Sequence, residues 1–181
     1  MKNVFYIAFI LIFSFINNSC KKEENKTPLT PKWSKVTALK NGEMWETGAM
    51  ASIDERHHKD SITIVANIYN SLGFWRESLY IGYLPIKEGT YDIFSNWGED
   101  EKFIKATYAT ISDDGDVVED RFMVFENENN YVEIESIIDN NEINGTFRIT
   151  FIRNPSDTVD NPSLPDTIRF TNGAFRLKII E

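Results

Sequence analysis

Two adjacent histidines are the first residues whose types suggest chemistry. His57 and His58 lie among acidic residues at positions 54, 55 and 60, and imidazole and carboxylate groups are both zinc ligands. Adjacent side chains on a strand point to opposite faces, however, and a zinc site needs three or four converging ligands. We therefore interpret residues 54–60 as a polar hairpin connection and predict no metal site.

An acidic run suggests calcium. Asp113-Asp114-Gly115-Asp116 is followed by Glu119 and Asp120, but this spacing does not match the twelve-residue calcium loop, which needs alternating ligands and a terminal glutamate. Asp and Gly are also the residues that tight turns require. The run therefore predicts a turn between two strands.

Catalytic machinery is hard to assemble from this chain. A Ser-His-Asp arrangement would have to use His57 or His58, and the sequence contains no Gly-x-Ser-x-Gly turn. Glycoside hydrolysis needs only two carboxylates, and the 28 acidic residues leave such a pair open without singling one out. We expect a protein that is not an enzyme and that uses no cofactor.

The four tryptophans are the more informative side chains. Trp33 and Trp45 fall in strand-like sequence and are expected in the core, whereas Trp75 and Trp97 lie in loop-like sequence. Exposed aromatic rings beside acids and amides stack on the apolar faces of sugars. Trp75 and Trp97 are therefore the candidate ligand-binding residues, the alternative being that each covers one end of the core.

Short runs of alternating apolar and polar residues predict the strands that would position these side chains. In residues 143–151, Phe147, Ile149 and Phe151 alternate with Arg148 and Thr150, and residues 168–179 repeat the pattern. A period of two predicts strands with one buried and one wet face. About ten such runs recur between turn signals, which favours an all-β fold: a single antiparallel β-sandwich or a flattened β-barrel.

The first twenty residues predict where in the cell the protein is located. After Met1-Lys2-Asn3, residues 4–16 are apolar apart from Ser14 and are too few to span a bilayer. Asn17-Asn18-Ser19 follows, and then Cys20, the only cysteine. The arrangement resembles a bacterial lipoprotein signal, in which the thiol is lipid-modified, for example with palmitate, and becomes the new N-terminus. Asn17 departs from that pattern, and ordinary secretion is the alternative.

Charge and composition divide the rest of the chain. Residues 1–19 contain one Lys and no acid, so their removal takes the formal net charge from −9 to −10, which disfavours nucleic acid as a partner. Residues 20–31 are polar, contain two prolines and predict a flexible tether. Residues 32–181 are long enough for one all-β domain, which is attached to the membrane through the lipid.

Four short motifs occur in a particular order: Asn41-Gly42-Glu43-Met44-Trp45, Gly89-Thr90-Tyr91, Ile143-Asn144-Gly145-Thr146-Phe147 and Thr171-Asn172-Gly173-Ala174-Phe175. Asn-Gly before an aromatic residue is common hairpin chemistry. With the leader, the order resembles a family of short Bacteroidetes lipoproteins of unknown function. The resemblance implies an all-β domain anchored to the outer membrane and implies no activity. Lys22-Glu23-Glu24 also resembles the signal that exports such lipoproteins to the cell surface.

Three Asp-Ser/Thr-aliphatic tripeptides resemble Bacteroidetes O-glycosylation acceptors, at Ser61, Thr158 and Thr167. Two of them lie in or beside the proline-rich loop from Asn154 to Pro165, where an enzyme could reach them.

These observations favour an outer-membrane-anchored surface lipoprotein that acts as a non-catalytic binding or accessory module, for a glycan or a surface partner. A structural envelope lipoprotein without a small ligand is the alternative. A carboxylate-dependent hydrolase is the third reading.

Overall fold

The computed structural model describes residues 34–54, 58–95, 103–139, 141–157 and 161–180, and these residues form strands and turns without a helix. The ten strands are β1 (Lys35–Lys40), β2 (Glu43–Asp54), β3 (His58–Tyr69), β4 (Trp75–Pro85), β5 (Gly89–Ser95), β6 (Ile104–Ile111), β7 (Val118–Val124), β8 (Tyr131–Ile138), β9 (Glu142–Arg153) and β10 (Thr167–Ile180). The predicted all-β fold of about ten strands is confirmed. Nothing in this part of the chain is a helix long and apolar enough to cross a membrane.

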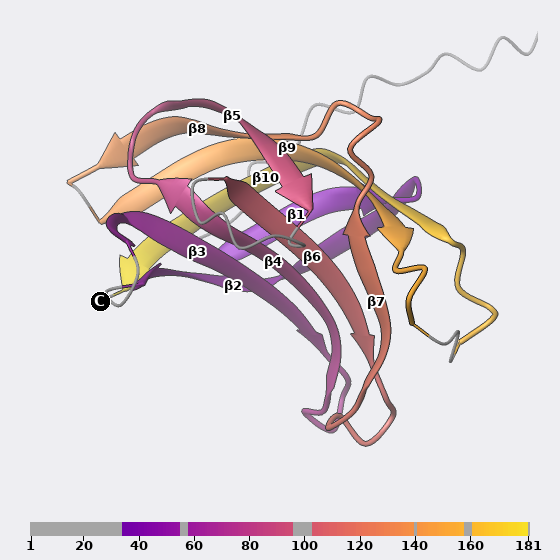
Figure 1. Cartoon of the computed structure of the whole chain (residues 1–181). Coiled ribbons are helices and arrows are strands. Elements are labelled where there is room, and N and C mark those ends of the chain that lie inside the picture. The colour runs from indigo at the N-terminus through magenta and orange to yellow at the C-terminus, as the bar shows by residue number, and fades with distance from the viewer. Residues whose placement is uncertain (1–33, 55–57, 96–102, 140, 158–160, 181) are drawn as a thin grey trace, which may run out of the picture.

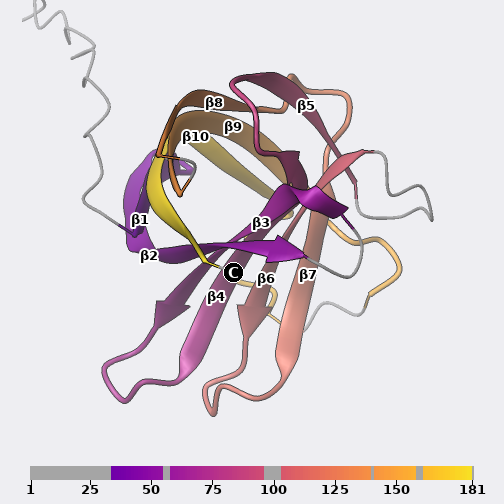
Figure 2. The same ribbon diagram turned by 90° about the vertical axis from the view of Figure 1, so that its left-hand side faces the viewer.

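All ten strands belong to one sheet, and that sheet closes on itself (Figures 1 and 2). Around the ring, β1, β2, β3, β4 and β6 follow one another, and β9 and β10 lead back to β1. Of the two architectures expected from the sequence, the closed arrangement is the one observed. Among the described residues, the ring closes within residues 35–180.

Two different routes close the ring between β6 and β9. At one end β7 pairs with residues 107–111 of β6 and with residues 151–153 of β9. At the other end β5 pairs with residues 104–106 of β6, and β8 links β5 to β9. One edge of β9 is thus shared between two partners: residues 142–148 pair with β8, and residues 151–153 pair with β7.

The sheet is mixed, which differs from the purely antiparallel sheet expected. β5 runs parallel to β6, and the end of β10 runs parallel to β2 at Ile179 and Ile180. The second contact follows from strand length. β1 has 6 residues and β10 has 14, so β10 continues past the end of β1 and meets β2 directly.

The core lies inside the ring and is built from the alternating faces that the sequence predicts. Phe147, Ile149 and Phe151 of β9 are buried, while Arg148 points to solvent. Thr150 is the exception: it is expected in water but only 2% exposed. The loop after β7 covers it, since Asn130 Oδ1 accepts a hydrogen bond from Thr150 N and Glu128 Oε2 accepts one from its hydroxyl.

Aromatic rings fill one end of the ring. Tyr108 lies 5.4–6.1 Å, centroid to centroid, from Phe122, Phe151 and Phe170, and Trp45 packs edge-on against Phe170 at 5.1 Å. The expected core position of Trp45 is confirmed, because it is only 3% exposed. Burying a side chain of this size contributes about 2–3 kcal/mol, so this cluster is a main source of stability.

Two of the three Asn-Gly motifs are not hairpin turns. Asn41-Gly42 does connect β1 to β2, and both residues have positive φ as the tightest hairpin turns require. Gly145 and Gly173 instead lie inside β9 and β10. Both glycines fall in the runs that the sequence predicts as strands, and close contact with an aromatic ring is a physical reason for glycine at each position.

Candidate functional site

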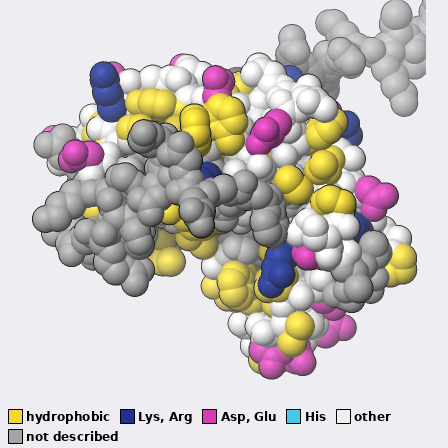
Figure 3. Space-filling view, viewed as in Figure 1, with side chains coloured by type: hydrophobic (Ala, Val, Ile, Leu, Met, Phe, Trp, Pro, Cys, Tyr) yellow, Lys and Arg dark blue, Asp and Glu magenta, His cyan; other side chains and the backbone are white. Residues whose placement is uncertain are grey.

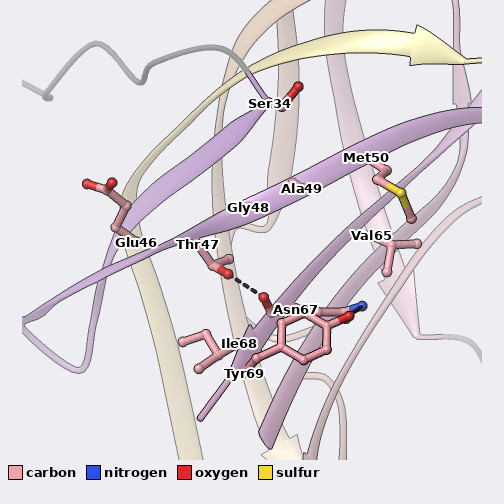
Figure 4. Close-up of a pocket in the computed structure, with 10 residues that line it drawn as sticks. All are labelled: Ser34, Glu46, Thr47, Gly48, Ala49, Met50, Val65, Asn67, Ile68 and Tyr69. Atoms are coloured by element: carbon pink, nitrogen blue, oxygen red, sulfur yellow. Dashed lines mark hydrogen bonds between the residues drawn. The ribbon is translucent and has the colours of Figure 1, made fainter. Parts of the chain in front are cut away.

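A groove opens where β2 changes its neighbour. Residues 43–48 of β2 pair with β1, whereas residues 49–54 pair with β3. The first half of β2 therefore diverges from the last residues of β3, and a groove of about 560 Å³ lies between them (Figure 4). The Thr47 hydroxyl bridges the two strands by donating to the carbonyl of Asn67.

The groove combines apolar and polar walls. Met50, Val65, Ile68 and Tyr69 supply apolar surface, and the polar side chains come from Ser34, Glu46, Thr47 and Asn67. Its volume is within the range of small-molecule sites, about 300–1,000 Å³. Glu46 is the charged residue of the wall and pairs with Lys35 on the neighbouring strand.

Tyr69 and Asn67 carry the chemistry of the groove. Tyr69 is 57% exposed, so its ring is available for stacking. Figure 4 shows the Asn67 amide beside the Tyr69 hydroxyl, which accepts a 3.4 Å hydrogen bond from Asn67 Nδ2. The Oδ1 atom of Asn67 is buried and has no hydrogen-bond partner in the described part of the chain. A buried acceptor of this kind is uncommon in folded proteins, and a ligand in the groove would reach it only after the Asn67 amide turns toward the groove.

Trp75, one of the two tryptophans predicted to bind a ligand, lies next to this groove. Its predicted loop position is wrong, because Trp75 begins β4 and is the ladder partner of Tyr69 across β3 and β4. The pairing follows a β-bulge between Ile68 and Tyr69, and Trp75 is not among the residues that line the groove. It is half-buried, and its Nε1 donates to the Glu77 carbonyl at 3.0 Å, which leaves its ring for contact. Trp97, like Trp33, lies outside the described residues.

The acidic run at 113–116 forms a turn, as the sequence predicts. Ser112 N donates to the Val117 carbonyl, and Gly115 N donates to the Ser112 carbonyl. The Ser112 hydroxyl lowers the pKa of Asp114, and Asp114 in turn raises the pKa of Asp116 by hydrogen bonding and charge repulsion. No three His, Cys, Asp or Glu side chains converge as a metal site would require within the described residues; His57 and the side chain of His58 lie outside them.

A second polar cluster lies inside the ring, at the aromatic end. Lys40 Nζ is 2.7 Å from each carboxylate oxygen of Glu77, and Trp45 Nε1 donates to Glu77 Oε2 at 2.9 Å. Burial, followed by the charge of Glu77 and a hydrogen bond to it, raises the pKa of Tyr108 far above its ordinary value. Glu77 faces a lysine and a tyrosine here, which is not the two-carboxylate arrangement of glycoside hydrolysis.

A buried ion pair attaches the proline-rich loop to the same end of the ring. Arg153 Nη1 bonds Asp120, whose side chain is fully buried, and Arg153 Nη2 donates to the Leu164 carbonyl at 2.9 Å. Arg153 also lies over the ring of Phe122 at 5.1 Å. These contacts hold the described parts of the loop, so this cluster has a structural explanation.

The predicted modification sites fall in different environments. Ser61 lies within β3 and is only 7% exposed, so its hydroxyl is largely covered in the folded chain. Thr167 begins β10 and is half-buried. Thr158 and Cys20 lie outside the described residues.

Tyr69 and Asn67 were not singled out from the sequence, although a signal for them exists. They occupy the wet face of the alternating run from Ile62 to Tyr69, immediately before a turn. An aromatic residue on a wet face is a stronger sign of binding than one in an unstructured loop, because a strand holds it in place. Comparisons with protein-family models, with curated proteins and with solved structures found no match for this chain.

Proposed function

We propose that this protein is a surface lipoprotein of the outer membrane whose β domain is a non-catalytic carbohydrate-binding module. Its ligand site is the groove between β2 and β3, with Tyr69 as the stacking platform and Trp75 beside it. The resemblance to short Bacteroidetes lipoproteins belongs to the same proposal, and so do the lipid on Cys20 and the exposure on the cell exterior.

One observation carries the assignment of carbohydrate. An exposed aromatic ring lies beside an amide whose buried Oδ1 has no partner in the described part of the chain, in a solvent-open groove of about 560 Å³. Sugars present an apolar face to a ring and hydroxyl donors at their edge, so they match both features. A sugar hydroxyl would bond Asn67 Oδ1 after the amide turns toward the groove.

A glycan array tests the proposal, using soluble protein that begins at Lys21 and so keeps every described residue. We expect binding to at least one neutral glycan and a loss of tenfold or more in affinity for Tyr69→Ala. Asn67→Leu should weaken binding as well, because it removes the acceptor while keeping a similar volume. Trp75→Ala should have a smaller effect, since Trp75 is half-buried.

Met44→Ala is the matched control, because Met44 is 57% exposed on β2, the other strand beside the groove, and does not line the groove. Binding that survives both Tyr69→Ala and Asn67→Leu would place the site elsewhere, with Trp97→Ala as the next variant. A chain that binds no glycan would favour the structural envelope alternative.

The proposed lipid anchor and membrane location have their own test. Cells grown with labelled palmitate should yield labelled protein, and Cys20→Ala should remove the label and release the protein from the membrane fraction. Unlabelled mature protein would contradict the lipid anchor without bearing on the groove.

A further inference from the structure

The turns of two neighbouring hairpins carry an exposed apolar surface. Leu72 and Phe74, between β3 and β4, are 78% and 44% exposed, and Val117 and Val118, at the start of β7, are 57% and 37% exposed. We call these four residues the hairpin-tip surface. Figure 2 shows the two hairpins projecting side by side from one end of the ring, and Figure 3 shows hydrophobic and acidic side chains together on this projection.

The two tips form one continuous surface. A Cβ atom placed on Gly115 would lie 3.0 Å from Phe74 Cβ and 3.1 Å from Trp75 N, so the backbones of the two turns are in contact. Arg76 Nη2 also lies 2.5 Å from Asp113 Oδ1, which joins the same turns by charge. The two turns that carry the apolar side chains therefore lie against each other.

The hairpin-tip surface is held in place before anything binds it. Asn70 Oδ1 accepts hydrogen bonds of 2.9 Å from Leu72 N and Phe74 N. In the other turn Ser112 Oγ accepts one of 3.2 Å from Val117 N. These polar bonds fix the turns, so a partner would not need to order them, and affinity rises when that entropy is already lost. Exposed apolar patches of this kind commonly mark interaction sites.

The charge around the hairpin-tip surface indicates the chemistry of a protein that could bind it. Asp113, Asp114 and Asp116 are exposed beside it, and the nearby cation Arg76 is already paired with Asp113. Anionic lipid would be repelled by these carboxylates, and a symmetric contact between two copies would bring the same carboxylates together. A partner that is apolar at its centre and basic at its rim satisfies both parts of the surface.

We propose that the hairpin-tip surface docks a protein whose contact face presents apolar side chains ringed by Lys and Arg. The docking surface is distinct from the groove and does not depend on the proposed glycan binding.

The test uses soluble protein beginning at Lys21 and two short probe peptides of equal positive charge, one of Leu and Lys and one of Ser and Lys. At about 150 mM salt, where exposed charges are largely screened, we expect the Leu–Lys peptide to bind about tenfold more tightly. In ¹⁵N-resolved spectra the shifts should be confined to residues 70–76 and 112–118. Leu72→Ser/Phe74→Ser should abolish the preference, and Met44→Ser should retain it, with circular dichroism confirming the fold of each variant.

Three results would overturn the proposal. The first is equal binding of the two peptides or an unchanged preference in Leu72→Ser/Phe74→Ser. The second is binding to phosphatidylcholine or phosphatidylglycerol vesicles that is lost in this variant, which would make the surface a membrane contact. The third is self-association in sedimentation equilibrium that the same variant removes, which would make it an interface between copies.

Discussion

Gly145 of β9 and Phe175 of β10 are ladder partners, and the Phe175 ring occupies the space that a side chain on Gly145 would need. A Cβ atom at Gly145 would lie 2.4 Å from Phe175 Cζ and 2.0 Å from the Glu133 carbonyl oxygen. The relationship is reciprocal: Gly173 of β10 is the partner of Phe147, whose ring lies 2.6 Å from the corresponding point. Each strand thus has a glycine at the position where an aromatic ring of the other strand packs.

Gly145→Ala should therefore destabilise the protein by about 3 kcal/mol or more, as overpacking of a tight core does. Urea unfolding measures the loss. Gly48→Ala is the control, because the nearest atom to its new Cβ would be 3.9 Å away, and it should leave stability unchanged or slightly raised. If Gly145→Ala does not accumulate as folded protein, Gly173→Ala, whose nearest obstacles are side-chain atoms, supplies the measurement. Wild-type stability in both glycine variants would contradict the explanation.

Lys40 and Glu77 join β1 to β4 across the inside of the ring, although these strands are not neighbours in the sheet. Glu77→Ala should lower the free energy of unfolding by about 3 kcal/mol, because it leaves the Lys40 charge and the Trp45 N–H without their partner. Glu46→Ala, which breaks the more exposed pair with Lys35, should change it by less than about 1 kcal/mol.

In a urea experiment the double variant Lys40→Met/Glu77→Leu should recover most of the loss, since an apolar pair can replace a part-buried ion pair. A double variant no more stable than Glu77→Ala would show that the pair itself, and not the unpaired lysine, accounts for the effect.

Tyr108 makes the stability of the folded protein fall at high pH. Its pKa is raised in the folded protein by burial and by Glu77, so above about pH 10 the unfolded chain loses this proton while the folded chain keeps it. The contribution is fully present below pH 10 and falls by up to about 1.4 kcal/mol per pH unit above it. Urea unfolding between about pH 9 and pH 11 should show the stability advantage of wild type over Tyr108→Phe shrinking. A constant difference would mean that Tyr108 titrates normally.

Asp120 and Arg153 form the most deeply buried ion pair that we describe, with side chains 0% and 7% exposed. Asp120→Ala should destabilise by about 3–5 kcal/mol, because it leaves Nη1 of the buried Arg153 side chain without its carboxylate. It should also speed proteolysis within residues 154–166, which Arg153 holds through the Leu164 carbonyl. Asp166→Ala is the matched control, since Asp166 contacts the same arginine at 3.1 Å but is 89% exposed, and it should have little effect. Equal effects of the two variants would contradict the role of burial.

The sequence alone determined which side chains form the core. Alternation is a local property of a strand, so Phe147, Ile149 and Phe151 could be assigned to the buried face without knowing their partners. It also determined the turns at Asn41-Gly42 and at residues 113–116, because turn chemistry depends on adjacent residues. The candidate site was less accessible to this reasoning: Trp75 was proposed as a loop residue, whereas it begins β4 as the ladder partner of Tyr69.

Only the tertiary structure decided which strand edges meet. The groove exists because β2 exchanges β1 for β3 at Ala49, and Tyr69 gains its role from the open space opposite it. The contact between Lys40 and Glu77 joins residues 37 positions apart, and Gly145 needs its hydrogen side chain because of the Glu133 carbonyl on β8 and the Phe175 ring on β10. Such pairings depend on the register and closure of the whole sheet, about which the local pattern of a single strand contains no information.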